Sequence, residues 1–125
     1  MTLLADKLLI KPEVDLLVLD APGGDLSLLG PMSDDVLVAT EPDGRYDVVV
    51  LFVDSPEAVR RRAAQAVRAV KPGGTLWLTY PEAAGHSAAE LAQLGWWERL
   101  YAAGLQIADE VAVGSAWSAL RFRPS

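Results

Sequence analysis

The chain has 125 residues, no cysteine and one histidine, His86, which fits a single domain and excludes a disulfide framework, a cysteine nucleophile and a two-histidine metal motif. Its net charge of −6 argues against nucleic acid as a partner, because phosphate backbones repel an acidic surface. No apolar run approaches the roughly 18 residues of a membrane span, and the chain starts without the features of a signal peptide. We therefore expect one cytoplasmic domain over residues 1–125, without a metal site and without membrane contact.

The first half of the chain alternates short apolar segments with turn sequences. Met1–Ile10 has the pattern of a short amphipathic helix, which Pro12 stops. Val14–Leu19 is a continuous apolar run, typical of a strand that is buried on both faces. The later elements expected in this half are a turn at 21–24, one helical turn at 25–29, a strand at 36–39, a turn at 41–44 and a strand at 47–53.

The second half contains two predicted helices and three predicted strands. Ser55 or Asp54 can cap a helix that starts at Pro56, has Lys71 in its last turn and ends at residues 72–74. A strand follows at 75–80. Further elements are a helix from the capping box of Ser87 and Glu90 to about Ala103, ended by Gly104, and strands at 105–113 and 116–123, joined by Gly114 and Ser115 as a hairpin.

Alternating strands and helices, with strands that are apolar throughout, indicate a parallel sheet covered on both faces. We therefore expect a Rossmann-like three-layer α/β/α sandwich. Its sheet of about six strands is mostly parallel and ends in an antiparallel hairpin.

Three stretches resemble the second half of a class I S-adenosylmethionine-dependent methyltransferase: DVVVLFV at 47–53, VKPGGTLWLTYP at 70–81 and AAGLQIADEVAVGSAWSALRFR at 102–123. The whole chain also resembles a family of small bacterial proteins that is grouped as a domain of unknown function. The stretches that carry this second resemblance are ADKLLIKP, LLVLDAPGG, EPDGRYDVVVLFV, KPGGTLW and WSALRF. The methyltransferase resemblance implies the strand order 2-1-3-4-6-5, with strand 6 antiparallel, and S-adenosylmethionine as a cofactor.

The chain departs from the methyltransferase pattern in two places. The cofactor loop of that family reads acid-x-Gly-x-Gly-x-Gly, and here Asp20 supplies the acid and Gly24 the second glycine, while Pro22 and Leu26 replace the other two. Only residues 41–46 separate the predicted strands at 36–39 and 47–53, too few for the helix and strand that the family has there. The resemblance thus implies a trimmed scaffold that lacks one strand–helix unit, with Glu41 near the position of the ribose-binding acid.

The carboxyl ends of three predicted strands carry Asp20, Asp54 and Tyr80. These ends lie at one edge of a parallel sheet, where ligands bind if the strand order reverses. The candidate cofactor-binding residues are Asp20, Pro22, Gly23, Gly24, Glu41, Asp54 and Tyr80.

Each of these residues also has a structural interpretation. Asp20 and Asp54 can share a proton or hold Mg²⁺, or instead order a turn and cap a helix. His86 can act as a base or be exposed on its loop. Ser55 lacks the frame of a hydrolase nucleophile. Three consecutive arginines, Arg60 to Arg62, fan across about 200° of a helix, which favours a solvated face over a phosphate site.

Trp96 and Trp97 are adjacent in the last predicted helix, about 100° apart around its axis. The wide apolar surface either seats this helix deeply or forms an interface. We therefore expect a homodimer through this helix.

These patterns favour a non-catalytic or small-ligand-binding domain on a reduced methyltransferase scaffold. One alternative is an active S-adenosylmethionine-dependent methyltransferase with an unusually short cofactor pocket. The other is a homodimeric interaction module that uses the helix with Trp96 and Trp97. The catalytic residues, if the chain is an enzyme, do not follow from these patterns, and a resident cofactor other than S-adenosylmethionine is not implied.

Overall fold

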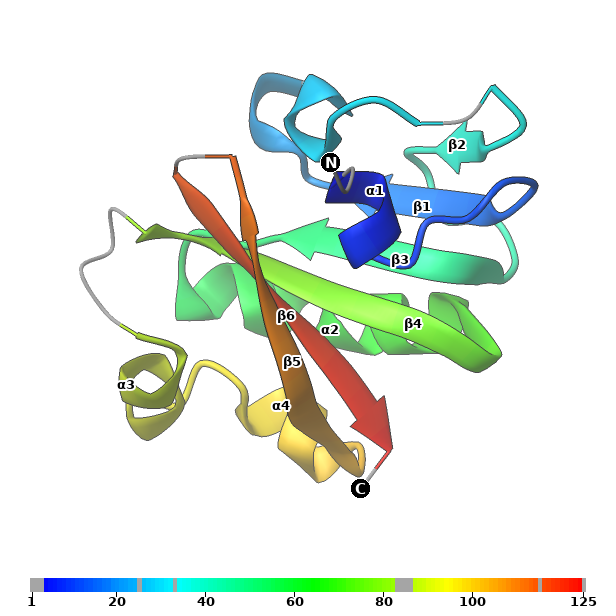
Figure 1. Cartoon of the computed structure of the whole chain (residues 1–125). Coiled ribbons are helices and arrows are strands. Elements are labelled where there is room, and N and C mark those ends of the chain that lie inside the picture. Colours follow the sequence, from blue (N-terminus) through cyan, green and yellow to red (C-terminus); the bar gives the residue numbers. More distant parts are fainter. Residues whose placement is uncertain (1–3, 25, 33, 83–86, 115, 125) are drawn as a thin grey trace.

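The computed structural model describes residues 4–24, 26–32, 34–82, 87–114 and 116–124. One six-stranded sheet runs through the molecule in the order β2-β1-β3-β4-β6-β5 (Figure 1). β1, β2, β3 and β4 are parallel to one another, and β6 is antiparallel to both of its neighbours, as the sequence predicts. The strands are β1 (Asp15–Leu19), β2 (Leu37–Ala39), β3 (Tyr46–Phe52), β4 (Val70–Pro81), β5 (Leu105–Val113) and β6 (Trp117–Pro124).

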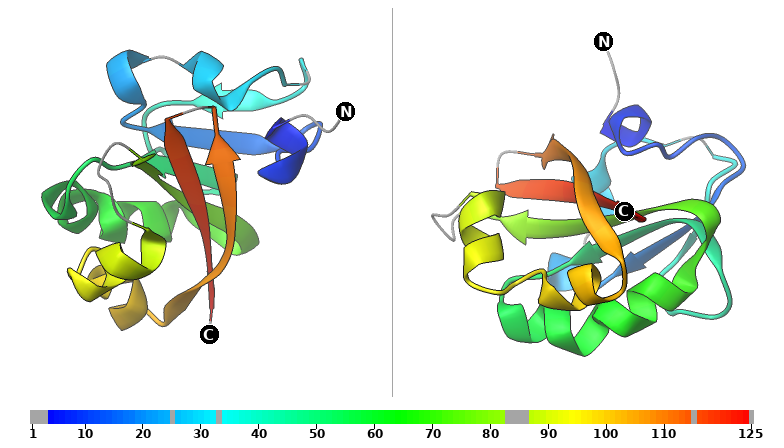
Figure 2. Two further views of the ribbon diagram at one scale, coloured as in Figure 1. Left: turned by 60° about the vertical axis from the view of Figure 1, so that its left-hand side comes forward. Right: turned by 90° about the horizontal axis from the view of Figure 1, so that it is seen from below.

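Helices cover both faces of the sheet and complete the expected three layers (Figure 2). One face carries α2 (Pro56–Ala69), α3 (Ala88–Gln93) and α4 (Glu98–Ala102). The other face carries α1 (Leu4–Lys7) and two short 3-10 turns at Pro22–Gly24 and Leu26–Leu29. No helix within the described ranges has the length and apolar composition needed to cross a membrane.

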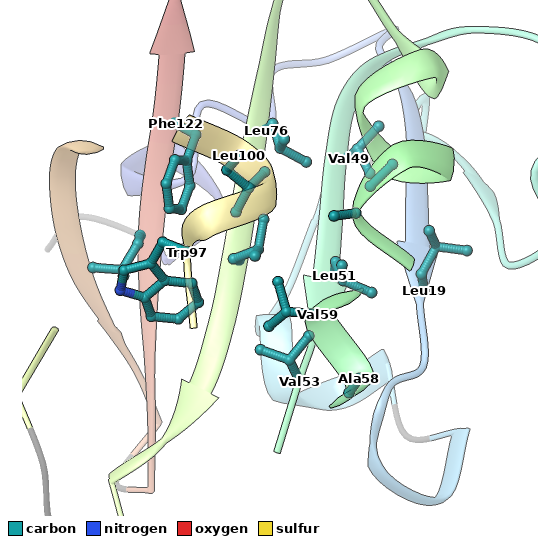
Figure 3. Close-up of a cluster of buried hydrophobic side chains, with 14 of the residues drawn as sticks. Leu19, Val49, Leu51, Val53, Ala58, Val59, Leu76, Trp97, Leu100 and Phe122 are labelled. Carbon is teal, nitrogen blue, oxygen red and sulfur yellow. The ribbon is translucent and has the colours of Figure 1, made fainter. Parts of the chain in front are cut away.

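Each face of the sheet has its own apolar core, because successive strand residues point to opposite sides. On the face that carries α2, α3 and α4, Val49 and Leu51 of β3 pack with Val59 of α2 and with Trp97 and Leu100 (Figure 3). On the other face the indole of Trp77 is fully buried and its Nε1 donates to the Leu8 carbonyl at 2.9 Å. That bond anchors the segment after α1 on the sheet.

The start of α2 follows from its sequence, but its end does not. The Ser55 side chain caps the helix by accepting from the Ala58 amide at 3.1 Å, and Pro56 occupies the first turn. The prediction that Lys71 lies in the last turn is wrong, because α2 ends at Ala69 and β4 begins at Val70. The Lys71 ammonium instead contacts Asp47 at 3.3 Å and Asp15 at 3.5 Å across the sheet.

The single helix predicted from Ser87 to Ala103 is two helices. Its capping box is confirmed, with Ser87 and Glu90 bonded reciprocally. Gly95 then adopts a φ of +84°, which ends α3 and turns the chain before α4. The turn allows both Trp96 and Trp97 to be buried, so the deep seating of this segment is the alternative that the structure shows. Association through it stays a prediction.

The C-terminal hairpin is present, but its predicted connection of two residues is wrong. Val113 pairs with Trp117, so three residues separate the paired positions. Gly114 has a φ of +62°, a conformation that glycine adopts without a steric penalty.

Candidate functional site

A cavity of about 750 Å³ lies at the carboxyl ends of β1, β3 and β4. The strand order reverses between β1 and β3, which is where open α/β sheets bind ligands. The cavity is lined by the ends of three strands and the segments after them, the first three turns of α2 and the start of β6: Asp20, Pro22, Phe52, Val53, Asp54, Ala58, Arg61, Arg62, Gln65, Pro81 and Trp117.

A double hydrogen bond between Arg62 and Asp20 forms one wall of the cavity. The Arg62 Nε and Nη2 atoms each donate to one oxygen of Asp20 at 3.0 Å, a geometry that suits a planar guanidinium. The pKa of Arg62 is raised above its ordinary value, chiefly by this hydrogen bond and further by the charges of Asp20 and Glu41. Arg62 therefore ties α2 to the end of β1, where Asp20 has a φ of +59°.

This pairing decides between the two roles predicted for the acids. The carboxylate of Asp20 is occupied by Arg62 and holds its turn against α2. Ser55, and not Asp54, caps α2. Asp54 is exposed at the cavity and makes no hydrogen bond or ion pair with any side chain in the described part of the chain. Of the two acids, Asp54 is thus the one without a side-chain partner among the described residues.

The opposite wall of the cavity is apolar. The rings of Phe52 and Trp117 meet edge to face with their centroids 5.2 Å apart. Phe52 ends β3 and Trp117 starts β6, so the pair joins the parallel part of the sheet to the hairpin. Pro81, the last residue of β4, extends this wall.

Arg61 adds a cationic group to the cavity. It is exposed and pairs with no side chain within the ranges that the structure describes. The neighbouring Arg60 is bound to Glu57 and lies outside the lining. The cavity thus holds one unpaired cation, Arg61, and one unpaired anion, Asp54, among its described residues.

The interpretation of the three arginines as only a solvated helix face missed Arg61 and Arg62. The sequence carried a pattern that could have found them. The lining residues of α2 are Ala58, Arg61, Arg62 and Gln65, which recur at the spacing of one helix face. Phe52 and Trp117 were predicted as strand residues, and their meeting depends on the pairing of distant strands.

The remaining candidate residues that the structure describes are not part of the cavity lining. Gly23 and Gly24 form an exposed 3-10 turn with φ of +61° and +73°, and a Cβ at either would meet nothing within 4 Å. Glu41 is exposed beyond the end of β2. Tyr80 is buried in the core, where its hydroxyl donates to Glu110 at 3.1 Å. His86 lies outside the described residues.

Burial raises the pKa of Tyr80, and its bond to Glu110 acts in the same direction. The buried ring is therefore a packing element of the sheet. Within the described ranges, no three side chains of the metal-binding types gather in one place.

Comparison with solved structures places this fold among methyltransferase-like folds. The chain is similar to ribosomal protein L11 methylase from Lactobacillus delbrueckii subsp. bulgaricus, with 14% identity and a TM-score of 0.62 over 97% of this chain and 74% of that one. It is similar to Aeropyrum pernix fibrillarin in complex with S-adenosyl-L-methionine, with 12% identity and a TM-score of 0.58 over 90% and 67% of the two chains. The DhpI–SAH complex gives 17% identity and a TM-score of 0.57 over 88% and 76%.

These similarities concern the fold, because the identities are low. No protein-family model and no curated protein sequence matches the chain. The Rossmann-like, methyltransferase-like fold that the sequence implied is therefore confirmed, with β2 at the edge of the described sheet. The resemblance to the small bacterial family stays a prediction.

Proposed function

We propose that the cavity binds S-adenosylmethionine or S-adenosylhomocysteine, and that the chain acts as a ligand-binding domain on a methyltransferase-like scaffold. The observation that carries the proposal is the cavity at the reversal of the strand order, with unpaired charges of both signs beside an aromatic wall. Its volume of about 750 Å³ lies within the range of small-molecule sites. Two of the similar structures are named as complexes with these ligands.

The chemistry of the lining fits one end of such a ligand. S-adenosylmethionine has an amino-acid end with a carboxylate and an ammonium group, next to a positively charged sulfonium. Arg61 suits the carboxylate, because a guanidinium can form two parallel hydrogen bonds to it. Asp54 suits the ammonium group, and the aromatic ring of Trp117 suits the sulfonium cation.

The adenosine end has fewer groups to hold it. Glu41, Gly23 and Gly24 lie outside the lining, and Pro22 is the one residue of the turn at Pro22–Gly24 that belongs to it. We therefore expect weaker binding than in a complete cofactor site. The similarity to a methylase supports methyl transfer as a second candidate function. Mass spectrometry of acceptor candidates incubated with the chain and S-adenosylmethionine tests it.

Isothermal titration calorimetry with S-adenosylmethionine and S-adenosylhomocysteine tests the binding. Asp54→Asn and Arg61→Gln should each weaken binding at least tenfold, since a hydrogen bond to a charged group contributes about 1.5–3 kcal/mol. Arg60→Gln is the matched control, because Arg60 neighbours Arg61 but does not line the cavity.

Binding that both cavity variants weaken and the control leaves unchanged would support the proposal. No heat of binding at millimolar ligand would refute it. Equal losses in Arg60→Gln and Arg61→Gln would also refute it, because a general loss of positive charge would then explain the effect.

A further inference from the structure

The outer edge of the sheet at β2 is open and apolar. β2 lies at the rim of the sheet beyond β1 (Figures 1 and 2). Leu37 is 67% exposed and Val38 is 39% exposed. Successive strand residues point to opposite faces, so both faces of this edge present an uncovered apolar side chain.

The backbone of β2 is positioned to pair with a further strand. The Leu37 amide donates to the Val14 carbonyl at 3.1 Å, so this residue bonds toward β1. Backbone groups of alternate strand residues face opposite neighbours, and the N–H and C=O of Val38 therefore face away from the sheet. Among the described strands, β1 is the one that pairs with β2. The N–H and C=O of Val38 can therefore form hydrogen bonds with an added strand.

The opposite edge of the sheet is protected in a way that β2 is not. β5 has an irregular register between Ile107 and Asp109 and carries the exposed acids Asp109 and Glu110. Irregularities and charges of this kind discourage pairing with other chains. β2 consists of Leu37, Val38 and Ala39, without a charge or an irregularity.

The segments beside β2 are acidic and favour a basic partner. Asp34 and Asp35 precede the strand, and Glu41 and Asp43 follow it, all with exposed side chains. Opposite charges across neighbouring strands stabilise pairing, and like charges oppose it. An incoming strand with lysine or arginine on both flanks would match this pattern.

The same charges disfavour a second copy of the chain. Antiparallel pairing centred on Val38 would set Asp35 directly opposite Glu41 of the other copy. Parallel pairing in register would set each acid against itself. Like charges oppose each other in either direction, so the edge fits a strand of a different composition.

We propose that the β2 edge binds an extended apolar segment with basic flanks from another protein, which adds a strand to the sheet. The open backbone at Val38 supplies the hydrogen bonds, Leu37 and Val38 supply apolar contacts on the two faces, and the acidic flanks select the partner. The residues of β2 do not line the cavity, and the proposal does not depend on the proposed function.

Fluorescence anisotropy with two labelled synthetic peptides tests the proposal on the full chain. Both peptides have an alternating valine–threonine centre, one with lysines at each end and the other with glutamates. The lysine peptide should bind at least tenfold more tightly than the glutamate peptide, and its affinity should fall as salt is raised.

Two variants locate the peptide on β2. Val38→Pro removes the outward N–H while leaving the bond of Leu37 to β1, and it should weaken binding of the lysine peptide at least tenfold. Leu37→Lys should do the same without altering the backbone. Leu94→Lys is the matched control, since Leu94 is 61% exposed on a different element, and it should leave binding unchanged.

Three results would overturn the proposal. The first is equal affinity for the two peptides or no binding of the lysine peptide at millimolar concentration. The second is binding that Leu37→Lys and Leu94→Lys change equally. The third is a dimer of the wild-type chain in analytical ultracentrifugation that Leu37→Lys dissociates, which would identify a second copy as the occupant.

Discussion

The bond between Asp20 and Arg62 is expected to stabilise the fold measurably, and a double-mutant cycle can isolate its contribution. The perturbations are Asp20→Asn, Arg62→Met and the combination. Asn tolerates the positive φ of +59° at this position, so the first change removes charge without adding backbone strain. Met keeps much of the apolar stem of Arg62.

The expected size of the interaction follows from its geometry and exposure. Two hydrogen bonds of 3.0 Å join the groups, which favours a real contribution. The side chains are 31% and 37% exposed, so water and salt screen the charges. Exposed pairs contribute about 0.2–1 kcal/mol, and the good geometry here places the coupling near the upper end, at about 1 kcal/mol. Unfolding entropy of about 2.1 cal/mol/K per residue converts 1 kcal/mol to about 4 °C in Tm for a chain of this length.

Urea unfolding of the four proteins, at low salt and at about 1 M NaCl, is the assay. The coupling energy should be about 1 kcal/mol at low salt and should shrink at high salt, because the Debye length falls to about 3 Å. A coupling of zero at low salt would refute the view that Arg62 holds α2 to β1. A coupling that salt leaves unchanged would refute its electrostatic origin.

Three further substitutions test other parts of the structure. Trp97→Ala should cost about 3–5 kcal/mol in urea unfolding, because the fully buried indole is lost from the core; a cost below 1 kcal/mol would place Trp97 at the surface. Thr79→Val should raise Tm in calorimetry, since the buried Thr79 Oγ1 has no hydrogen-bond partner among the described residues; a lower Tm would reveal one. The hydrogen bond from the backbone N–H of Asp15 is the main cause that lowers the pKa of Asp47 from its ordinary value of 3.8. The stability that this acid contributes is therefore complete above pH 3.8 and is lost as pH falls through the lower pKa of the folded state. Asp47→Asn should reduce the loss of unfolding free energy at acid pH in a pH series, and an unchanged slope would contradict the assignment.

The sheet was predictable because each strand carries its own pattern. Residues 48–53 are apolar throughout, a composition typical of a strand that is buried on both faces. The full strand order came from the methyltransferase resemblance, and the structure agrees with it strand by strand. Local caps were also readable, as Ser87 and Glu90 show, since their bonds span a few residues.

The composition of the cavity was less predictable because it depends on contacts between distant residues. Asp20 and Arg62 are 42 positions apart, and no local pattern pairs them. Tyr80, by contrast, was predicted as a cofactor-binding residue but does not line the cavity. It lies at the end of β4, as expected for a ligand contact, but its side chain points into the core next to Trp97, with the two ring centroids 6.1 Å apart. The position of Tyr80 near the end of its strand correctly predicts the edge of the sheet at which it lies. The alternation of side chains along the strand determines which face of the sheet its ring points to.

The change in stability on Gly95→Ala distinguishes the single helix predicted from the sequence for residues 87–103 from the two helices in the structure, because the two predict changes of opposite sign. In one continuous helix, Gly95→Ala would stabilise the protein by up to about 1 kcal/mol, because alanine has the higher helix propensity. In the structure Gly95 has a φ of +84°, where an alanine side chain costs about 1–2 kcal/mol. We therefore expect Gly95→Ala to lower Tm by about 4–8 °C, and Gly95→Asn to lower it less, because asparagine tolerates this conformation. A higher Tm for Gly95→Ala would mean that one helix continues through this position. The turn between α3 and α4, which allows both Trp96 and Trp97 to be buried, would then be absent.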